Sequence, residues 1–224
     1  MSERYYALQA SLPPLPYFAT ASRLPINEAR LRQRTTLLAP PDRHALDLAM
    51  ELVRWRRQLP ESGDQRVARL YRRFMQECAN AELRDFVDFR MGLRAVVAAL
   101  RRQRRHAEPG AGELAGFGHW DALIRRRWHE PELGLACVYP WIADARRLLE
   151  AGDALGLERL LMDAVWRRLQ PLADAFPFRF EAIVAYMFRW DVLARWVDYD
   201  AARAQVRFAQ LLDEVIDGKR FTVG

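Results

Sequence analysis

The sequence has few cysteines, histidines and lysines, and each shortage narrows the classes of function open to it. Its 2 cysteines, Cys78 and Cys137, lie far apart in the chain, so no disulfide framework is indicated and a reducing cytosol suits the chain. The 4 histidines are scattered, and His129-Glu130 is followed by Pro131, which excludes the helical zinc motif H-E-x-x-H. We therefore expect exposed histidines in loops and no bound metal or cofactor.

Nucleotide-binding loops are missing as well. Lys219 is the only lysine, so the chain has no phosphate loop of the type G-x-x-x-x-G-K-[ST]. Glycines at 110, 112 and 116 resemble part of a dinucleotide-binding loop, but an arginine-rich helix is expected before them where a buried strand is required. The sequence therefore excludes a phosphate loop of this type and disfavours a dinucleotide-binding loop at these glycines.

Paired carboxylates occur at helical spacing in two places, Asp85 with Asp88 and Asp213 with Asp217. An enzyme that uses two acids needs them in a cleft with separated pKa values. Here each pair has arginines nearby, so we interpret both as ion-paired surface carboxylates. Together with the missing motifs, this predicts a protein that is not an enzyme.

The chain also lacks a long apolar run. The longest, Gly134 to Ala143, is far shorter than the roughly 20 residues that a membrane-spanning helix needs. The segment Ala19-Thr20-Ala21 resembles a signal-peptide cleavage site, but Glu3, Gln9 and three prolines precede it in place of an apolar core. We therefore expect a cytoplasmic protein.

Arginine is abundant, and with it comes a formal net charge of +6. Residues 54–73 and 84–105 are the most basic segments, so an electropositive surface is expected that meets acidic protein, nucleic acid or anionic lipid. Arginines at the end of a helix also interact favourably with its dipole, which is a purely structural explanation for part of the cluster. The predicted partner-binding residues are Arg101, Arg102, Arg104, Arg105, Arg125, Arg126 and Arg127.

Apolar residues recur at three- and four-residue steps through most of the sequence, and no alternating strand pattern is found. This predicts an all-α fold, a multi-helix bundle of antiparallel helical hairpins. Only residues 5–12 are ambiguous between strand and helix. The expected helices cover residues 25–38, 42–59 with Asp42 as N-cap, a segment after Asp64, and residues 82–105, 120–128, 141–151 and 200–217.

The clearest helical pattern runs from Leu157 to Trp196, with a turn favoured near Pro177. Two apolar stripes in its second half predict a helix enclosed by other helices. Arg189, Asp191 and Arg195 are left to face water, and Arg195 follows Asp191 at the spacing that supports an ion pair. We therefore predict a helical hairpin that supplies a central part of the core, with its tryptophans buried.

The domain prediction is a single helical domain over residues 1–224. Residues 106–119 contain four glycines and a proline, which makes them the candidate boundary between two lobes.

Several segments together resemble a family of bacterial proteins that is associated with operons of V-type (vacuolar/archaeal-type) ATPases and related to the C-type subunit of these ATPases, which is the d-type subunit in eukaryotes. The segments extend over nearly the whole chain: Tyr5–Pro13, Phe86–Arg90, Trp128–Pro131, Pro140-Trp141, Leu157–Leu161 through Trp166, and Phe180–Ile183 through Arg189-Trp190-Asp191 and Arg195-Trp196.

This resemblance implies a non-catalytic, all-helical subunit or accessory factor that links the central stalk to the membrane ring of proteolipid subunits. It implies ATPase subunits as partners, a peripheral position at the cytoplasmic face of the inner membrane, and support of proton or sodium transport. The chain is shorter than the C-type subunits, which have a three-repeat arrangement, and this leaves open whether it is a true subunit or an accessory. The resemblance identifies no catalytic residues.

The alternative is a basic helical protein that binds RNA or DNA. Tryptophans stand beside arginines, Trp55 next to Arg54 and Arg56, and Trp128 after Arg125 to Arg127. Such neighbours combine phosphate contacts with base stacking. No recognisable nucleic-acid-binding motif accompanies them.

Overall fold

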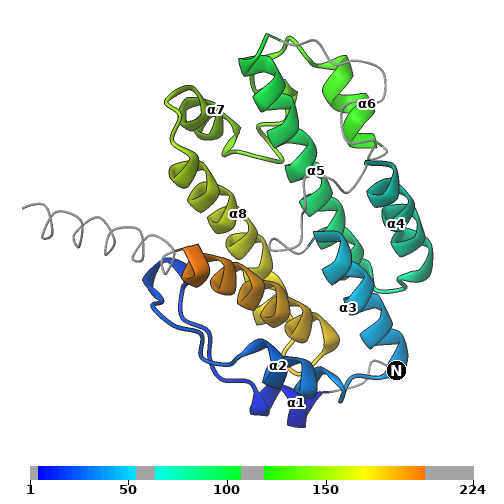
Figure 1. The fold of residues 1–224 in the computed structure, drawn as a ribbon. Helices are drawn as coiled ribbons and strands as arrows, with labels where there is room; N and C mark the ends of the chain where they lie inside the picture. Colours follow the sequence, from blue (N-terminus) through cyan, green and yellow to red (C-terminus); the bar gives the residue numbers. More distant parts are fainter. Residues whose placement is uncertain (1–4, 54–63, 107–118, 200–224) are drawn as a thin grey trace, which may run out of the picture.

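The computed structural model describes residues 5–53, 64–106 and 119–199. This part of the chain is all-α and forms a multi-helix bundle, as predicted (Figure 1). Four predictions fall outside it: the helix at 200–217, the ion pairing of Asp213 and Asp217, nearly all of the candidate lobe boundary at 106–119, and Trp55 with its neighbouring arginines. The hydrophobic core includes residues from both sides of that boundary, such as Leu100 and Trp120.

The first half of the chain provides a short N-terminal segment and three longer helices. The elements are α1 (Tyr6–Ser11), η1 (Phe18–Thr20), α2 (Glu28–Thr35), α3 (Pro40–Val53), α4 (Asp64–Glu77) and α5 (Ala81–Arg104). Residues 6–11, ambiguous in the sequence, are therefore helical.

Asparagine side chains cap the N-termini of two of these helices. The Asn27 side chain accepts a hydrogen bond from the Arg30 amide at 2.9 Å, and Asn80 accepts one from the Leu83 amide at 2.8 Å. The prediction that Asp42 caps α3 was wrong, because α3 already begins at Pro40. Proline suits a first helical turn, since its missing N–H would have no partner there. Asp42 instead accepts a hydrogen bond from the Tyr5 hydroxyl at 2.5 Å.

The second half contains the predicted hairpin. Its elements are α6 (His119–Arg126), η3 (Pro131–Gly134), α7 (Ile142–Glu150), α8 (Ala154–Ala175) and a helix over residues 180–199. The turn between α8 and the 180–199 helix lies at residues 176–179, as Pro177 predicts. The N-terminal segment packs on this turn, because the Tyr5 amide donates to the Phe178 carbonyl and the Phe178 amide donates to the Gln9 side chain.

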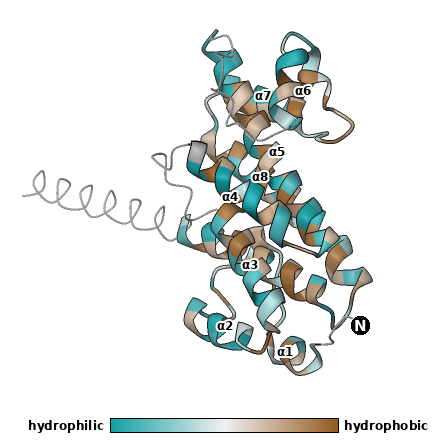
Figure 2. Ribbon diagram, turned by 90° about the vertical axis from the view of Figure 1, so that its right-hand side faces the viewer, coloured by the Kyte–Doolittle hydropathy of each residue, from teal (hydrophilic) through white to brown (hydrophobic). Residues whose placement is uncertain are grey.

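Helix α5 runs through the middle of the molecule and contacts α3, α6, α7 and α8. Helices α1 and α2 lie at one end, and α6 and α7 lie at the other (Figures 1 and 2). Most helices carry both apolar and polar residues, as Figure 2 shows, so each has one side for the core and one for water. None of the helices in the described ranges has the length and apolar character that a membrane crossing requires.

Two of the three tryptophans of the hairpin, Trp166 and Trp190, are buried as predicted, whereas Trp196 is half-buried. Trp190 is 1% exposed, and its indole N–H donates to the Ile26 carbonyl at 2.8 Å. Trp166 is also buried, and Trp196 packs edge-on against Phe18 with ring centres 5.4 Å apart. These contacts attach the segment before α2 to the hairpin.

The prediction that Asp191 faces water was wrong. Asp191 is 3% exposed, and Arg90 of α5, another buried charge, is 5% exposed. Burial lowers the pKa of Arg90 to about 10, while the charge of Asp191 acts in the opposite direction. Arg195, expected to pair with Asp191, instead pairs with Glu158 of α8 at 2.8 Å. The polar positions of this helix therefore connect it to its neighbours.

Candidate functional site, an arginine-lined groove

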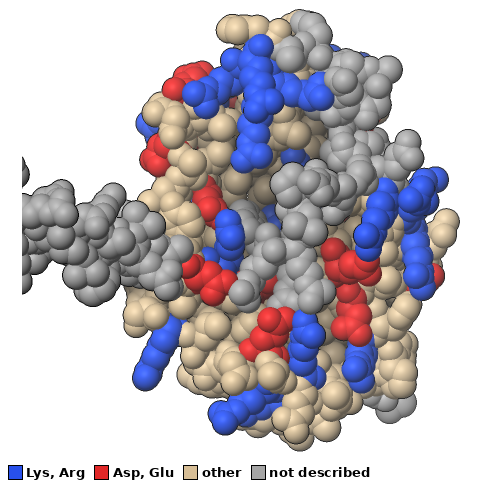
Figure 3. Space-filling view, viewed as in Figure 1, with Lys and Arg blue, Asp and Glu red and all other residues tan. Residues whose placement is uncertain are grey.

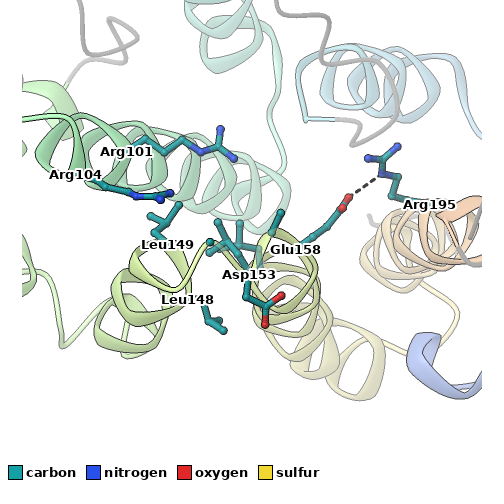
Figure 4. A pocket seen from close by; sticks show the side chains of 11 residues that line it. Arg101, Arg104, Leu148, Leu149, Asp153, Glu158 and Arg195 are labelled. Carbon is teal, nitrogen blue, oxygen red and sulfur yellow. Dashed lines mark hydrogen bonds and ion pairs between the residues drawn. The ribbon is translucent and has the colours of Figure 1, made fainter.

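A groove of about 470 Å³ lies where α5, α7, α8 and the end of the 180–199 helix meet (Figure 4). Arg101 and Arg104 extend from α5 on one side, and the Glu158–Arg195 pair lies at the far end. The remaining lining residues are Leu148, Leu149, Gly152, Asp153, Ala154, Leu157 and Leu161. The groove thus combines apolar and charged lining residues.

The turn between α7 and α8 determines the shape of one side. Gly152 has a φ of +72°, a backbone conformation that residues with a Cβ rarely adopt. Asp153 follows, and its side chain accepts a hydrogen bond from the Gly156 amide at 2.8 Å, which caps α8. The cap leaves no room beside Gly156, because an added Cβ would lie 2.3 Å from the Asp153 carboxylate. This turn brings the start of α8 to the groove in one defined orientation.

The charges of the groove are unevenly compensated. Glu158 is neutralised by Arg195, whereas Asp153 is exposed and accepts a hydrogen bond from the Gly156 amide at the start of α8. Arg101 and Arg104 are exposed, and neither forms an ion pair with any residue in the described ranges. They are three positions apart on α5 and therefore lie on the same side of the helix. The groove is therefore left with uncompensated positive charge on its α5 side.

The other predicted arginines of α5 differ in exposure. Arg102 is half-buried, whereas Arg105 is exposed and forms the C-cap of the helix. In the space-filling view of Figure 3, arginines gather at the end of the molecule where α5 ends and α7 lies. Arg147 of α7 adds an exposed charge there, although it pairs with Asp144 at 2.8 Å.

The second predicted group, Arg125 to Arg127, is largely engaged within the fold. Arg125 pairs with Asp121 one helical turn earlier at 3.1 Å. Arg127 donates to the Gly134 carbonyl at 2.7 Å, so it holds the loop after α6 in place. Only Arg126 of the three is exposed without an ion pair in the part of the chain that the structure describes. The group thus contributes one arginine to the basic end rather than three.

Gln103 fixes this end of the molecule. Its side-chain amide donates to the Trp128 carbonyl at 2.7 Å, and its oxygen accepts a hydrogen bond from Arg146 at 2.9 Å. The end of α5, the loop after α6 and helix α7 are therefore connected through one side chain. Trp128 itself is 6% exposed, so its ring packs in the core and cannot stack on a base.

Asp88 is not the arginine-paired surface carboxylate that the sequence suggested. It accepts hydrogen bonds from the Tyr71 hydroxyl at 2.6 Å and from the Trp120 indole at 3.2 Å. Burial, together with the hydrogen bond to Asp88, raises the pKa of Tyr71 above its ordinary value. His119 lies 3.7 Å from the same carboxylate. Asp88 therefore ties α4 and α6 to α5, which is a packing role.

The histidine, cysteine and acidic side chains of the described ranges are dispersed, and no disulfide joins the two cysteines. No group of three or more histidine, cysteine or acidic side chains is arranged there to hold a metal ion. All four histidines are exposed, as expected, but His44 and His119 lie on helices rather than in loops. Cys78 is buried and Cys137 exposed, and both are free thiols.

A family model described as "Protein of unknown function (DUF2764)" matches residues 56–219, which is most of the chain. The chain belongs to this family. No curated protein and no solved structure gives a significant match. The matched range extends from before α4 to beyond the 180–199 helix, so it contains every residue that lines the groove.

Sequence reasoning identified the α5 side of the groove but missed the opposite side. The helix expected over residues 141–151 contains Leu148 and Leu149 without any predicted role in binding, and no prediction covers Asp153. Glu158 and Arg195 are 37 positions apart, so no local spacing predicts that they pair. The glycine-aspartate sequence after α7 was the one available signal, because it indicates a tight turn that opens a new helix.

Proposed function

We propose that this chain is a non-catalytic component or accessory factor of a V-type rotary ATPase, similar to the C-type subunit. In this role it links the central stalk to the membrane ring of proteolipid subunits and supports proton or sodium transport. It stays at the cytoplasmic face of the inner membrane through its protein partners. The observation that carries the proposal is a helical body with one arginine-rich end whose exposed guanidinium groups are left for a partner.

The segments that resemble the ATPase-associated family hold this body together. Tyr5 bonds to Asp42, and Phe86 packs against Phe188 with ring centres 4.7 Å apart. Trp190 joins the hairpin to the segment before α2. A body that transmits torque must resist deformation, and close-packed interiors of this kind have low compressibility. The resemblance therefore supports the proposal through the rigidity of the fold rather than through a chemical signature.

The arginine-rich end supports the proposal through its surface chemistry. Arg101, Arg104, Arg105 and Arg126 are exposed there. Arginine is enriched at protein interfaces, where its planar guanidinium binds carboxylates through two parallel hydrogen bonds. Gln103 holds the elements beneath these arginines, so little order has to be gained when a partner binds.

Purification of the tagged protein from its host membranes in mild detergent, followed by mass spectrometry, tests this proposal. We expect stalk or membrane-ring subunits of the ATPase to copurify with it. A matched bait with Trp190→Ala, in which the fold is weakened, should recover less of them. Failure of the wild-type protein to recover any part of a rotary ATPase would lead us to abandon the assignment.

Nucleic-acid binding is the second candidate, because the same exposed arginines suit phosphate groups. The burial of Trp128 removes one of the two base-stacking residues on which this alternative relied. The test is the affinity for a generic oligonucleotide as a function of salt concentration. Binding through phosphates must weaken steeply as salt rises, and a flat or undetectable response excludes it.

A further inference from the structure

We propose that the groove between α5, α7 and α8 binds an acidic amphipathic helix of a partner protein. The exposed Arg101 and Arg104 would pair with its carboxylates, and the leucine floor would bury its apolar residues. The inference deepens the proposed function, on which it rests, by naming the surface and the chemistry of the segment that binds there.

The charge of the groove is the first argument. Of its two acidic side chains, Glu158 pairs with Arg195, and Asp153 is exposed on the α7–α8 side, where it accepts a hydrogen bond from the Gly156 amide. Arg101 and Arg104 are like charges at the spacing where side chains on a helix meet, which is unfavourable without a counter-charge. Carboxylates on a partner would relieve this repulsion and form charge-assisted hydrogen bonds.

The floor of the groove is the second argument. Leu148 and Leu149 of α7 are half-buried, and Leu157 and Leu161 of α8 lie deeper. An apolar strip with charged edges matches the surface of an amphipathic helix, which binds through residues at three- and four-residue steps. A small anion would use the arginines but leave the exposed parts of Leu148 and Leu149 in water. The combination therefore favours a helix over a free phosphate or carboxylate.

The order already present at the site is the third argument. The Asp153 cap fixes the start of α8, and Gln103 fixes the end of α5 through Trp128 and Arg146. Both sides of the groove are thus held by hydrogen bonds within the fold. A partner helix would meet a preformed surface, which lowers the entropic cost of binding.

The test uses the full-length protein in its host, with a photo-crosslinking amino acid in place of Leu149. The same substitution at Leu37 is the control, because Leu37 is 59% exposed and follows α2 at the opposite end of the molecule. We expect the Leu149 position to crosslink to a partner peptide that carries acidic and apolar residues at helical spacing, and the Leu37 position not to.

Charge reversal provides the second measurement. Arg101→Glu with Arg104→Glu should reduce the Leu149 crosslink at least about tenfold, because opposed charges at the edge of an interface weaken binding strongly. The control, Arg23→Glu with Arg30→Glu, makes the same change in net charge on exposed residues near α2 and should leave the crosslink unchanged.

Several outcomes overturn the inference. These are a crosslink to residues 200–224 of the same chain, to nucleic acid, or to a partner peptide without acidic residues, and a crosslink that charge reversal does not reduce. The proposed function fails separately. If ATPase subunits copurify whether or not Arg101 and Arg104 are reversed, the groove is excluded and the function stands. If an acidic helix from an unrelated protein is trapped, the groove inference stands and the ATPase assignment falls.

Discussion

Helix α5 places arginines in two opposite environments. Arg90, near its middle, is buried and donates a hydrogen bond to the Val53 carbonyl at 3.1 Å. The negative charge of buried Asp191 stabilises the protonated form of Arg90. Arg101 and Arg104, about three turns further along, are exposed and have no ion pair with any described residue. The same residue type thus ties helices together at one point and lines an open groove at another.

The contrast between Arg90 and the exposed pair shows that arginines in one helix can have two different roles, one in stability and one in binding. A charge that is buried in the fold needs compensation, because an uncompensated charge in the core costs several kcal/mol. Charges that are available for a partner lie where water already solvates them, so they cost little until a ligand arrives. The two groups should therefore respond to mutation in opposite ways, one through stability and the other through binding.

The largest effect is expected at the buried arginine. Arg90→Met removes the positive charge beside Asp191 and leaves that carboxylate buried with less compensation. We expect the free energy of unfolding to fall by about 3–5 kcal/mol, measured by denaturant unfolding.

The double variant Arg90→Met with Asp191→Leu is the informative control for this change. It removes both charges and fills the space with apolar side chains, so it should recover most of the lost stability. A double variant that is no more stable than Arg90→Met would show that the charge of Asp191 is not the reason for the loss.

A loss of similar size is expected at the centre of the hairpin. Trp190→Ala opens a cavity in the core and leaves the Ile26 carbonyl without its donor. We expect a loss of about 3–5 kcal/mol in the same unfolding measurement. Trp190→Phe, which keeps much of the volume but not the hydrogen bond, should lose less. Unchanged stability together with lost partner binding would reverse the assignment of Trp190 to the core.

Much of the fold was predictable because helical periodicity is a local signal. The hairpin from Leu157 to Trp196, its turn at Pro177 and the burial of Trp166 and Trp190 follow from the spacing of residues that are near one another in the chain. Asp191 was the failure within this segment. Asp191 is buried and acts electrostatically on Arg90 from another helix, and Arg195 pairs with Glu158 rather than with its own helical neighbour.

The groove was predictable only in part, because its contacts also join residues that are distant in the chain. The arginine cluster at the end of α5 was visible in the sequence, and Arg101 and Arg104 do line the groove. Arg125 and Arg127 were equally prominent in the sequence, yet Arg125 forms an ion pair with Asp121 and Arg127 donates a hydrogen bond to the Gly134 carbonyl. Whether an arginine is available to a partner depends on the acceptors that the fold brings near it, and composition does not contain that information.

A smaller effect is expected at the cap of α8. Asp153→Ala removes the acceptor for the Gly156 amide and should lower the free energy of unfolding by about 1 kcal/mol. Asp153→Asn keeps an acceptor of the same shape and should lose much less. Equal losses in the two variants would indicate that the charge of Asp153 contributes more than its cap.

The smallest effect on stability is expected at the exposed arginines of the groove. Arg101→Ala with Arg104→Ala should change the free energy of unfolding by no more than about 0.5 kcal/mol, because exposed residues away from packed contacts contribute little. Removing the repulsion between two like charges can even stabilise α5 slightly. The expected change lies in the Leu149 crosslink, which should weaken while the unfolding curve stays in place. A large loss of stability would show that these arginines serve the fold as Arg90 does, and the contrast along α5 would no longer hold.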